Sequence, residues 1–151
     1  MTAINHALTG SLIGLIVGEP LLAVPLAVVS HFVCDAIPHF GGRLPPEVSL
    51  KTKWFRNYLI TDASLCVALV VCLLVVMPRH WLLSAICAFA AASPDLLSMN
   101  RFFKTRAGRP WKAGRYVTFA KNIQWFEQPI GAVVEVAWFV AAIVLLVPFL
   151  K

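Results

Sequence analysis

Charge is scarce in this chain, and negative charge is the scarcer kind. Only 13% of its 151 residues are charged, 7 of them acidic against 13 lysines and arginines, while 60% are hydrophobic. An ordinary soluble domain carries roughly 25% charged residues, and a domain of this length cannot bury so much apolar surface in its own interior. The composition therefore excludes a disordered chain and argues against a soluble one. We predict a single integral membrane domain over residues 1–151.

Two common sequence patterns are also missing. The cysteines contain no C-x-x-C pair, and all of them fall in apolar stretches: Cys34, Cys66, Cys72 and Cys87. We interpret them as small packing residues rather than as a redox or metal motif. The first 17 residues lack the positive region of a signal peptide, so we expect them to remain on the mature protein.

Long apolar segments dominate what remains. They are Ala3–Val17, Pro20–Ile37, Tyr58–Met77, Trp81–Met99 and Pro129–Leu150. At 1.5 Å per residue, all but the short first segment are long enough, or nearly so, to cross ~30 Å of hydrocarbon. The sequence therefore predicts an all-α bundle of about five transmembrane helices.

The positive charges indicate how this bundle is oriented. Eleven of the 13 lysines and arginines lie in two polar connections, four in Pro38–Asn57 and seven in Asn100–Gln128. With five spans both connections face the same side, and only Arg79 and Lys151 face the other. The positive-inside rule then predicts a multi-pass protein of the inner (cytoplasmic) membrane, with the N-terminus in the cytoplasm and the C-terminus outside.

Aromatic residues alternate with the cations of the second connection. We interpret this segment as one that lies along the inner membrane interface against anionic lipids. Nucleic-acid binding is the alternative for a basic, aromatic stretch. We do not predict it, because the anionic lipid surface already accounts for the pattern.

Ionisable residues gather in the cytoplasmic half of the predicted bundle and come from all its segments. They are His6, His31, Asp35, His39, Asp62, Asp95, Glu127 and Glu135. Each unpaired charge at depth costs about 2.5–3.5 kcal/mol on insertion scales, so these residues are expected to satisfy one another. A shared site is our hypothesis; the alternative is a hydrogen-bond network that only joins helices.

The second segment carries the clearest pattern within this group. His31 and Asp35 are spaced i, i+4, which places both on one helix face within reach of a common ion. Pro38 ends the helix, so that His39 is free to turn back toward them. Three costly residues at this spacing favour an ion-binding run over packing alone.

Two further segments supply a ligand each. Glycines follow His6 at positions 10, 14 and 18, and this small-residue face predicts close packing, most simply against the second segment. That packing would carry His6 toward His31. In the fourth segment Pro94 precedes Asp95 and removes a helix hydrogen bond, which allows the helix to open toward a cavity.

We therefore predict a divalent metal site. Its ligands are His6, His31, Asp35, His39 and Asp95. Imidazoles with carboxylates favour zinc, our first choice, with manganese or iron as alternatives. The acids exceed what one ion needs, so either two ions bind, or spare acids such as Asp62 and Glu135 act as catalytic proton acceptors and as partners that support the ligands. The sequence leaves both cases open.

Two short stretches resemble known metal-binding families. Asn5-His6-Ala7-Leu8-Thr9-Gly10 and Pro94-Asp95 resemble pieces of the YdjM-like family of predicted bacterial membrane-bound metal-dependent hydrolases, which implies His6 and Asp95 as metal ligands. The Asp-His after the Pro-Asp and the His-Arg-Gly-x-Thr-His run of that family are absent here. His31-Phe32-x-x-Asp35 is similar to the zinc-binding His-Phe-x-x-Asp of secreted phospholipase C and nuclease-type enzymes.

These patterns predict an inner-membrane, metal-dependent hydrolase that acts on a lipid or lipid-phosphate head group at the cytoplasmic leaflet through a metal-activated water. The expected partners are membrane lipids and an anionic lipid substrate, which the cationic face would concentrate. The alternative is a divalent metal-ion or proton transporter that uses the same His/Asp/Glu cluster. A purely structural subunit is a third possibility, but it leaves the clustering unexplained.

Overall fold

The chain folds as helices joined by turns and two longer connections. The computed structural model describes residues 1–41, 48 and 50–151. Arg43, one of the basic residues of the first connection, lies outside this range. Within it there is no β-strand, only an isolated bridge between His39 and Glu127. The prediction of an all-α fold is confirmed.

The helix bounds follow the apolar segments closely at the start of the chain and less closely later. The helices are α1 (Ala3–Val17), α2 (Pro20–Ala36), α4 (Lys53–Val76), α5 (Trp81–Ala92), the 3-10 helix η1 (Ser93–Ser98), α6 (Met99–Arg106), α7 (Arg115–Ile123), α8 (Gly131–Leu146) and the 3-10 helix η2 (Val147–Leu150). Helix α4 begins before the predicted Tyr58, because Thr52 accepts the amide of Phe55 at 3.1 Å and caps a polar first turn.

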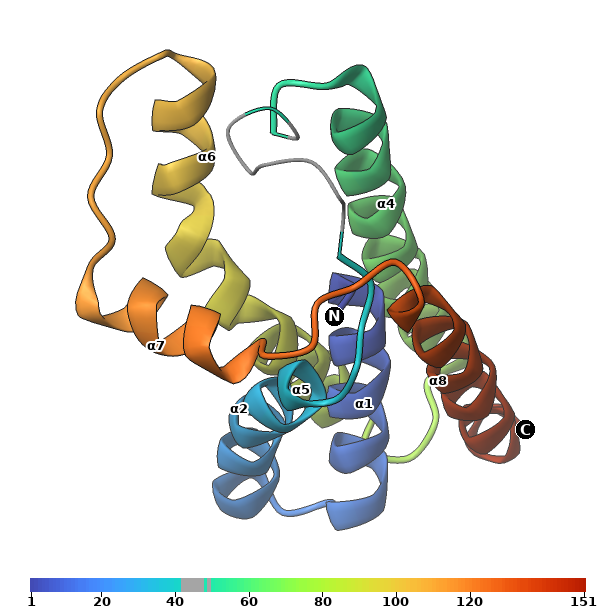
Figure 1. Ribbon diagram of the computed structural model, residues 1–151. Helices are drawn as coiled ribbons and strands as arrows, with labels where there is room; N and C mark the ends of the chain where they lie inside the picture. The colour runs from blue at the N-terminus through green and yellow to red at the C-terminus, as the bar shows by residue number, and fades with distance from the viewer. Residues whose placement is uncertain (42–47, 49) are drawn as a thin grey trace.

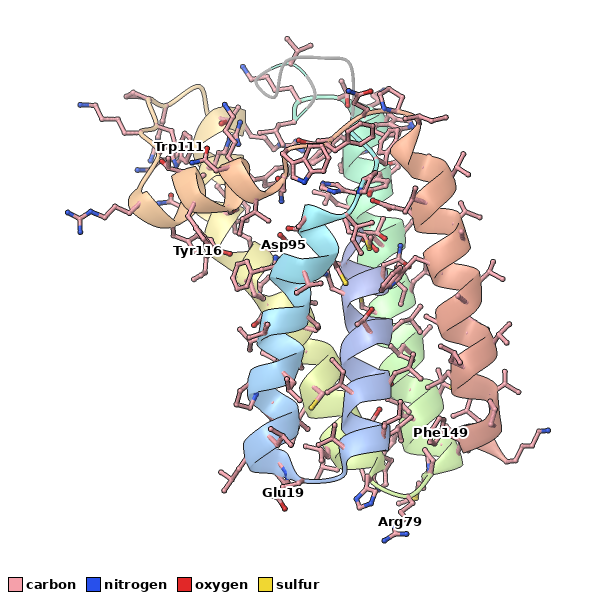
Figure 2. All side chains as sticks on the ribbon, turned by 60° about the horizontal axis from the view of Figure 1, so that its bottom comes forward. Glu19, Arg79, Asp95, Trp111, Tyr116 and Phe149 are labelled. Carbon is pink, nitrogen blue, oxygen red and sulfur yellow. The ribbon has the colours of Figure 1, made fainter. Side chains whose placement is uncertain are left out.

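Helix α1 is the central helix of the bundle (Figure 1). It contacts α2, α4, α5 and α8, and its buried residues run from Ile4 to Leu15. In Figure 2 these five helices run side by side, with Glu19 and Arg79 at one end and Asp95, Tyr116 and Trp111 at the other. Helix α7 lies crosswise at this second end. His6, the ionisable residue of α1, therefore lies inside the protein rather than against its surroundings.

The outer surface of the bundle is apolar. Leu21 is 88% exposed and Val75 76% exposed, and large hydrophobic side chains also face outward from α5 and α8. Three helical stretches of the described chain are long and apolar enough to cross a membrane: Lys53–Val76, Trp81–Arg106 and Gly131–Leu150. Helices α1 and α2 are shorter apolar helices. These features are those of a membrane protein.

The glycine face of α1 packs against α5. A Cβ atom on Gly10 would collide with the carbonyl oxygen of Cys87, and one on Gly14 would lie 2.6 Å from Cα of Ser84. The prediction that this face packs against the second helix is wrong. Helix α5 offers small residues at matching spacing, so its backbone approaches more closely, and the Ser11 and Ser84 hydroxyls hydrogen-bond across the interface at 2.7 Å.

The fourth apolar segment does not end where hydropathy falls. Pro94 stands in η1, where the chain tightens from an α-helix to a 3-10 helix. It then continues as α6 to Arg106, beyond the predicted end at Met99. The basic region 100–128 therefore contains two short helices, α6 and α7, and neither has a buried residue.

Candidate metal centre

Three separate helices bring ligand atoms together at the end of the bundle that carries α7. His6 of α1, His31 of α2 and Asp95 of η1 each offer an atom within 4.8 Å of the other two, the spacing of a possible metal site. Both histidines are buried, whereas the Asp95 side chain is 46% exposed. With Asp35 these residues form what we call the His–Asp cluster. The cluster has a buried side and an open side.

The orientation of His31 is fixed by the backbone of α5. Its Nδ1 lies 2.8 Å from the carbonyl oxygen of Ala91. A carbonyl can only accept, so Nδ1 carries the proton and, in the neutral ring, Nε2 keeps its lone pair. Metal-binding histidines usually donate their second ring nitrogen to a carbonyl or carboxylate in this way. His31 is therefore held in the tautomer that a metal ligand requires.

Several acceptor atoms face one another around that lone pair. Nε2 of His31 lies 3.4 Å from Asp35 Oδ2 and 3.8 Å from Asp95 Oδ1. The rings of His6 and His31 stack with their centroids 4.1 Å apart. Lone pairs and carboxylates at these distances repel one another unless a cation, such as a proton, an ammonium group or a metal ion, lies among them. The arrangement favours cation binding.

His6 is the least satisfied polar residue of the cluster. Its side chain is fully buried, and its Nε2 lies 3.1 Å from Asp35 Oδ1. That short approach is not aligned as a hydrogen bond, and neither ring nitrogen has a hydrogen-bond partner among the described residues. Buried polar atoms are nearly always paired. An orphaned imidazole beside a second imidazole and a carboxylate fits the donor set of zinc.

Asp35 is already engaged on both oxygens. The amino group of Met1 donates to Oδ1 at 2.6 Å, and the side-chain amide of Gln124 donates to Oδ2 at 2.8 Å. Its carboxylate also faces both imidazoles. Asp35, a predicted ligand, is not among the three residues whose ligand atoms lie within 4.8 Å of one another. Its contacts suit an acid that supports the cluster from the side.

Asp62 of α4, the first of the two predicted proton acceptors, lies against the start of α1. Its two carboxylate oxygens accept the amides of Ala3 at 2.8 Å and Ile4 at 2.9 Å. An acid at this position satisfies free amides and interacts favourably with the helix dipole. The geometry favours an orienting role for Asp62, since it fixes the turn of α1 that carries His6.

His39 and Glu135 lie in a neighbouring layer. The ring Nδ1 of His39 lies 2.9 Å from the carbonyl oxygen of Ile37, and its backbone pairs with residues 126–128. Glu135 accepts the amide of Phe40 at 3.2 Å. Gly131 allows the close approach, because a Cβ there would collide with the His39 carbonyl. The structure does not bring His39 or Glu135 into the set of three ligand atoms that lie within 4.8 Å.

Helix α7 and Gln124, the residue directly after it, supply contacts that sequence reasoning missed. Besides the Gln124 contact, the hydroxyl of Tyr116 donates to the carbonyl of Pro94 at 2.8 Å. Burial raises the pKa of Tyr116, and the charges of Asp95 and Asp35 raise it further, so the phenol remains a donor. The signal for this helix was the helical spacing of Tyr116, Phe119 and Ile123; Phe119 contacts the ring of Phe32 on α2.

No family model matches the chain, and no curated protein or solved structure matches it either.

Proposed function

We propose that the chain is a membrane-bound, metal-dependent hydrolase whose ion is held by His6, His31 and Asp95. The observation that carries the proposal is the convergence of these three ligand atoms within 4.8 Å from three different helices. The fixed tautomer of His31 and the unpaired nitrogens of His6 support it. A bound divalent ion, zinc being the best fit to this donor set, acidifies water and polarises a phosphoryl or acyl oxygen.

The chain's own residues prepare such a site. The Ala91 carbonyl holds the His31 imidazole, the Asp35 carboxylate lies close to both rings, and Asp62 holds the turn of α1 that presents His6. Glu135 is left as the candidate proton acceptor in the layer next to the cluster. Hydrolysis joins the water oxygen to phosphorus or to an acyl carbon, and the ester oxygen leaves with a proton.

The proposed topology is five crossings with the N-terminus in the cytoplasm and the C-terminus outside. Helices α1 and α2 have 15 and 17 residues, or about 22 and 26 Å of helix. A short crossing is tolerable for α1 because other helices enclose it. The cationic helices α6 and α7 lie at the end that holds the cluster, and the positive-inside rule places that end in the cytoplasm of an inner membrane.

The proposed substrate is a lipid or lipid-phosphate head group. Asp95 is the partly exposed member of the cluster, at the end of the bundle where cationic residues are concentrated. An anionic head group would be attracted there.

A transporter would need a path from the cluster to the opposite end of the bundle. Close packing of Gly10 and Gly14 against α5 fills the interface between α1 and α5 just beyond His6. Ala23, Ala27 and Leu83 belong to an apolar cluster that fills the region between α2 and α5. This packing favours a site that opens at one end over a pathway.

Zinc titration of the EDTA-treated, purified protein tests the proposal. We expect one zinc ion to bind per chain and His31→Gln to weaken zinc binding by at least about 100-fold. Loss of a residue that only supports a ligand costs about 10–100-fold, so loss of a ligand itself should cost at least as much. His80→Gln is the matched control, because His80 lies in the turn between α4 and α5 at the opposite end. Equal zinc binding by the wild type and His31→Gln would overturn the metal site.

Two functional assays separate the enzyme from the transporter. Release of a head group from vesicles, dependent on zinc and on His31, is expected of the hydrolase. Zinc uptake into sealed proteoliposomes, dependent on His31 and without head-group release, would reject the hydrolase in favour of the transporter.

A further inference from the structure

A cavity of about 400 Å³ opens between α6 and the segment that leads into α7. Its polar lining consists of Ser98, Asn100, Arg101, Trp111, Lys112 and Tyr116. Ligand cavities generally measure 300–1,000 Å³. The space is therefore large enough for a phosphate group with part of its ester.

The lining has the chemistry of an anion site. It contains an arginine and a lysine, an amide and two hydroxyls, and no acidic residue is among those that line it. The guanidinium of Arg101 lies over the ring of Trp111, 5.1 Å from its centroid. Stacking fixes the plane of a guanidinium while its N–H groups stay free to form the paired hydrogen bonds that phosphate accepts.

One residue connects the cavity to the neighbourhood of the His–Asp cluster. Tyr116 lines the cavity, and its hydroxyl binds the carbonyl of Pro94, the residue before Asp95. Figure 2 shows Tyr116 and Asp95 at the same end of the bundle, with Trp111 farther out. The cavity thus lies at the end of the bundle that holds the cluster, and Tyr116 connects it to the segment that carries Asp95.

Apolar residues complete the cavity and continue onto the outer surface. Leu97 and Val117 line it, and Leu97 is also 65% exposed. Phe103 on α6 and Phe119 on α7, which lie close in the chain to residues that line the cavity, are more than half exposed. A ligand with an anionic group and an acyl chain would match both surfaces.

We propose that this cavity binds a phosphate group, either as the phosphate monoester of a lipid or as free inorganic phosphate, with Arg101 and Lys112 as its cationic partners. The inference deepens the proposed function and rests on it for the catalytic meaning of the cavity, because the bound phosphate would be presented to the ion held by His6, His31 and Asp95.

Calorimetric titration of the metal-free protein in neutral detergent tests binding apart from catalysis. The probes are dihexanoyl phosphatidic acid, inorganic phosphate and uncharged dihexanoylglycerol. We expect phosphatidic acid to bind and Arg101→Gln to weaken it by at least about 10-fold, since hydrogen bonds between charged groups are lost. Lys112→Gln should weaken it in the same direction.

Arg106→Gln is the matched control. Arg106 also lies on α6 over an aromatic ring, 5.6 Å from the centroid of Phe102, but it does not line the cavity. We expect less than about 2-fold change, and an unchanged melting temperature for both arginine variants. Equal losses in both variants, or binding of dihexanoylglycerol as tight as that of phosphatidic acid, would overturn the proposal.

The phosphate arm identifies the source of the ligand. Inorganic phosphate that binds as tightly as phosphatidic acid, with the same Arg101 dependence, supports free phosphate; much weaker binding supports the lipid. Because no metal is present, the cavity and the hydrolase can fail separately. Binding that depends on Arg101 in a protein that holds no zinc would keep the anion site and reject the metal-dependent hydrolase.

Discussion

Asp62 connects the start of α1 to α4 through two amide hydrogen bonds, from Ala3 and Ile4. His6 follows within the same turn. A buried carboxylate in this position fixes where the imidazole stands without touching it. The position of the candidate ligand therefore depends on a residue more than fifty positions away in the chain.

Replacing Asp62 tests this dependence. Asp62→Ala should lower the free energy of unfolding by about 1–2 kcal/mol, because the two amides lose their acceptor, and zinc affinity should fall as His6 loses its fixed position. Thermal unfolding in detergent and zinc titration measure the two effects. Ser64→Ala, at an exposed site on the same helix where the hydroxyl bonds only the Ile60 carbonyl, should change neither. Unchanged stability in Asp62→Ala would contradict the capping role.

The sequence could group some site residues and not others. Depth and helical spacing were enough to put His6, His31 and Asp95 at one end of the bundle, because helix geometry alone fixes those positions. His39 follows Pro38, where α2 has ended, and its backbone pairs with residues 126–128. Pairing between segments so distant in the chain has no local signature. Gln124, which donates to Asp35, is unpredictable for the same reason.

At the scale of elements, the apolar segments predicted where the helices lie. They did not predict which helices pack together or where a helix continues into polar sequence. The bounds of α1 and the start of α2 follow from hydropathy and turn residues. Helix α6 (Met99–Arg106) extends the helical region past the apolar segment, since it contains helix-forming residues. Hydropathy did not reveal this extension, because the segment has little hydrophobicity. Helices α1 and α5 pack closely because each has a face of small residues. The spacing of Ser84, Cys87 and Ala91 in the sequence could have predicted this contact.

The interface between α1 and α5 should be intolerant of one added methyl group. Gly10→Ala places a Cβ against the backbone of Cys87, which cannot move as a side-chain tip can, so we expect a loss of about 1–3 kcal/mol in stability. Gly114→Ala is the control, because nothing lies within 4 Å of a Cβ there. Melting temperatures measured in the same detergent compare the two. Equal stability of the variants would show that the helices separate easily.

For the whole molecule, the distribution of charge predicts one orientation. Helices α6 and α7 place their cations at the end opposite Glu19 and Arg79 (Figure 2). We expect a reporter fused after Lys151 to be active only outside the cytoplasm, and one fused to the end of α7 only inside, as the positive-inside rule requires. A C-terminal reporter active in the cytoplasm would contradict five crossings and would move the cluster relative to the lipid leaflets.

The 3-10 helix η1 sets the rotation of everything that follows it. Six residues of 3-10 helix turn through about 720° and rise about 12 Å, whereas six α-helical residues turn through about 600° and rise about 9 Å. Helix α6 is therefore turned by about a third of a revolution relative to an unbroken α5. Asp95 lies within η1, and Arg101 lies just past its end. The length of η1 therefore determines the angle around the helix axis between the Asp95 carboxylate and the Arg101 guanidinium. One segment thus couples the angular setting of the candidate metal centre to that of the proposed anion cavity.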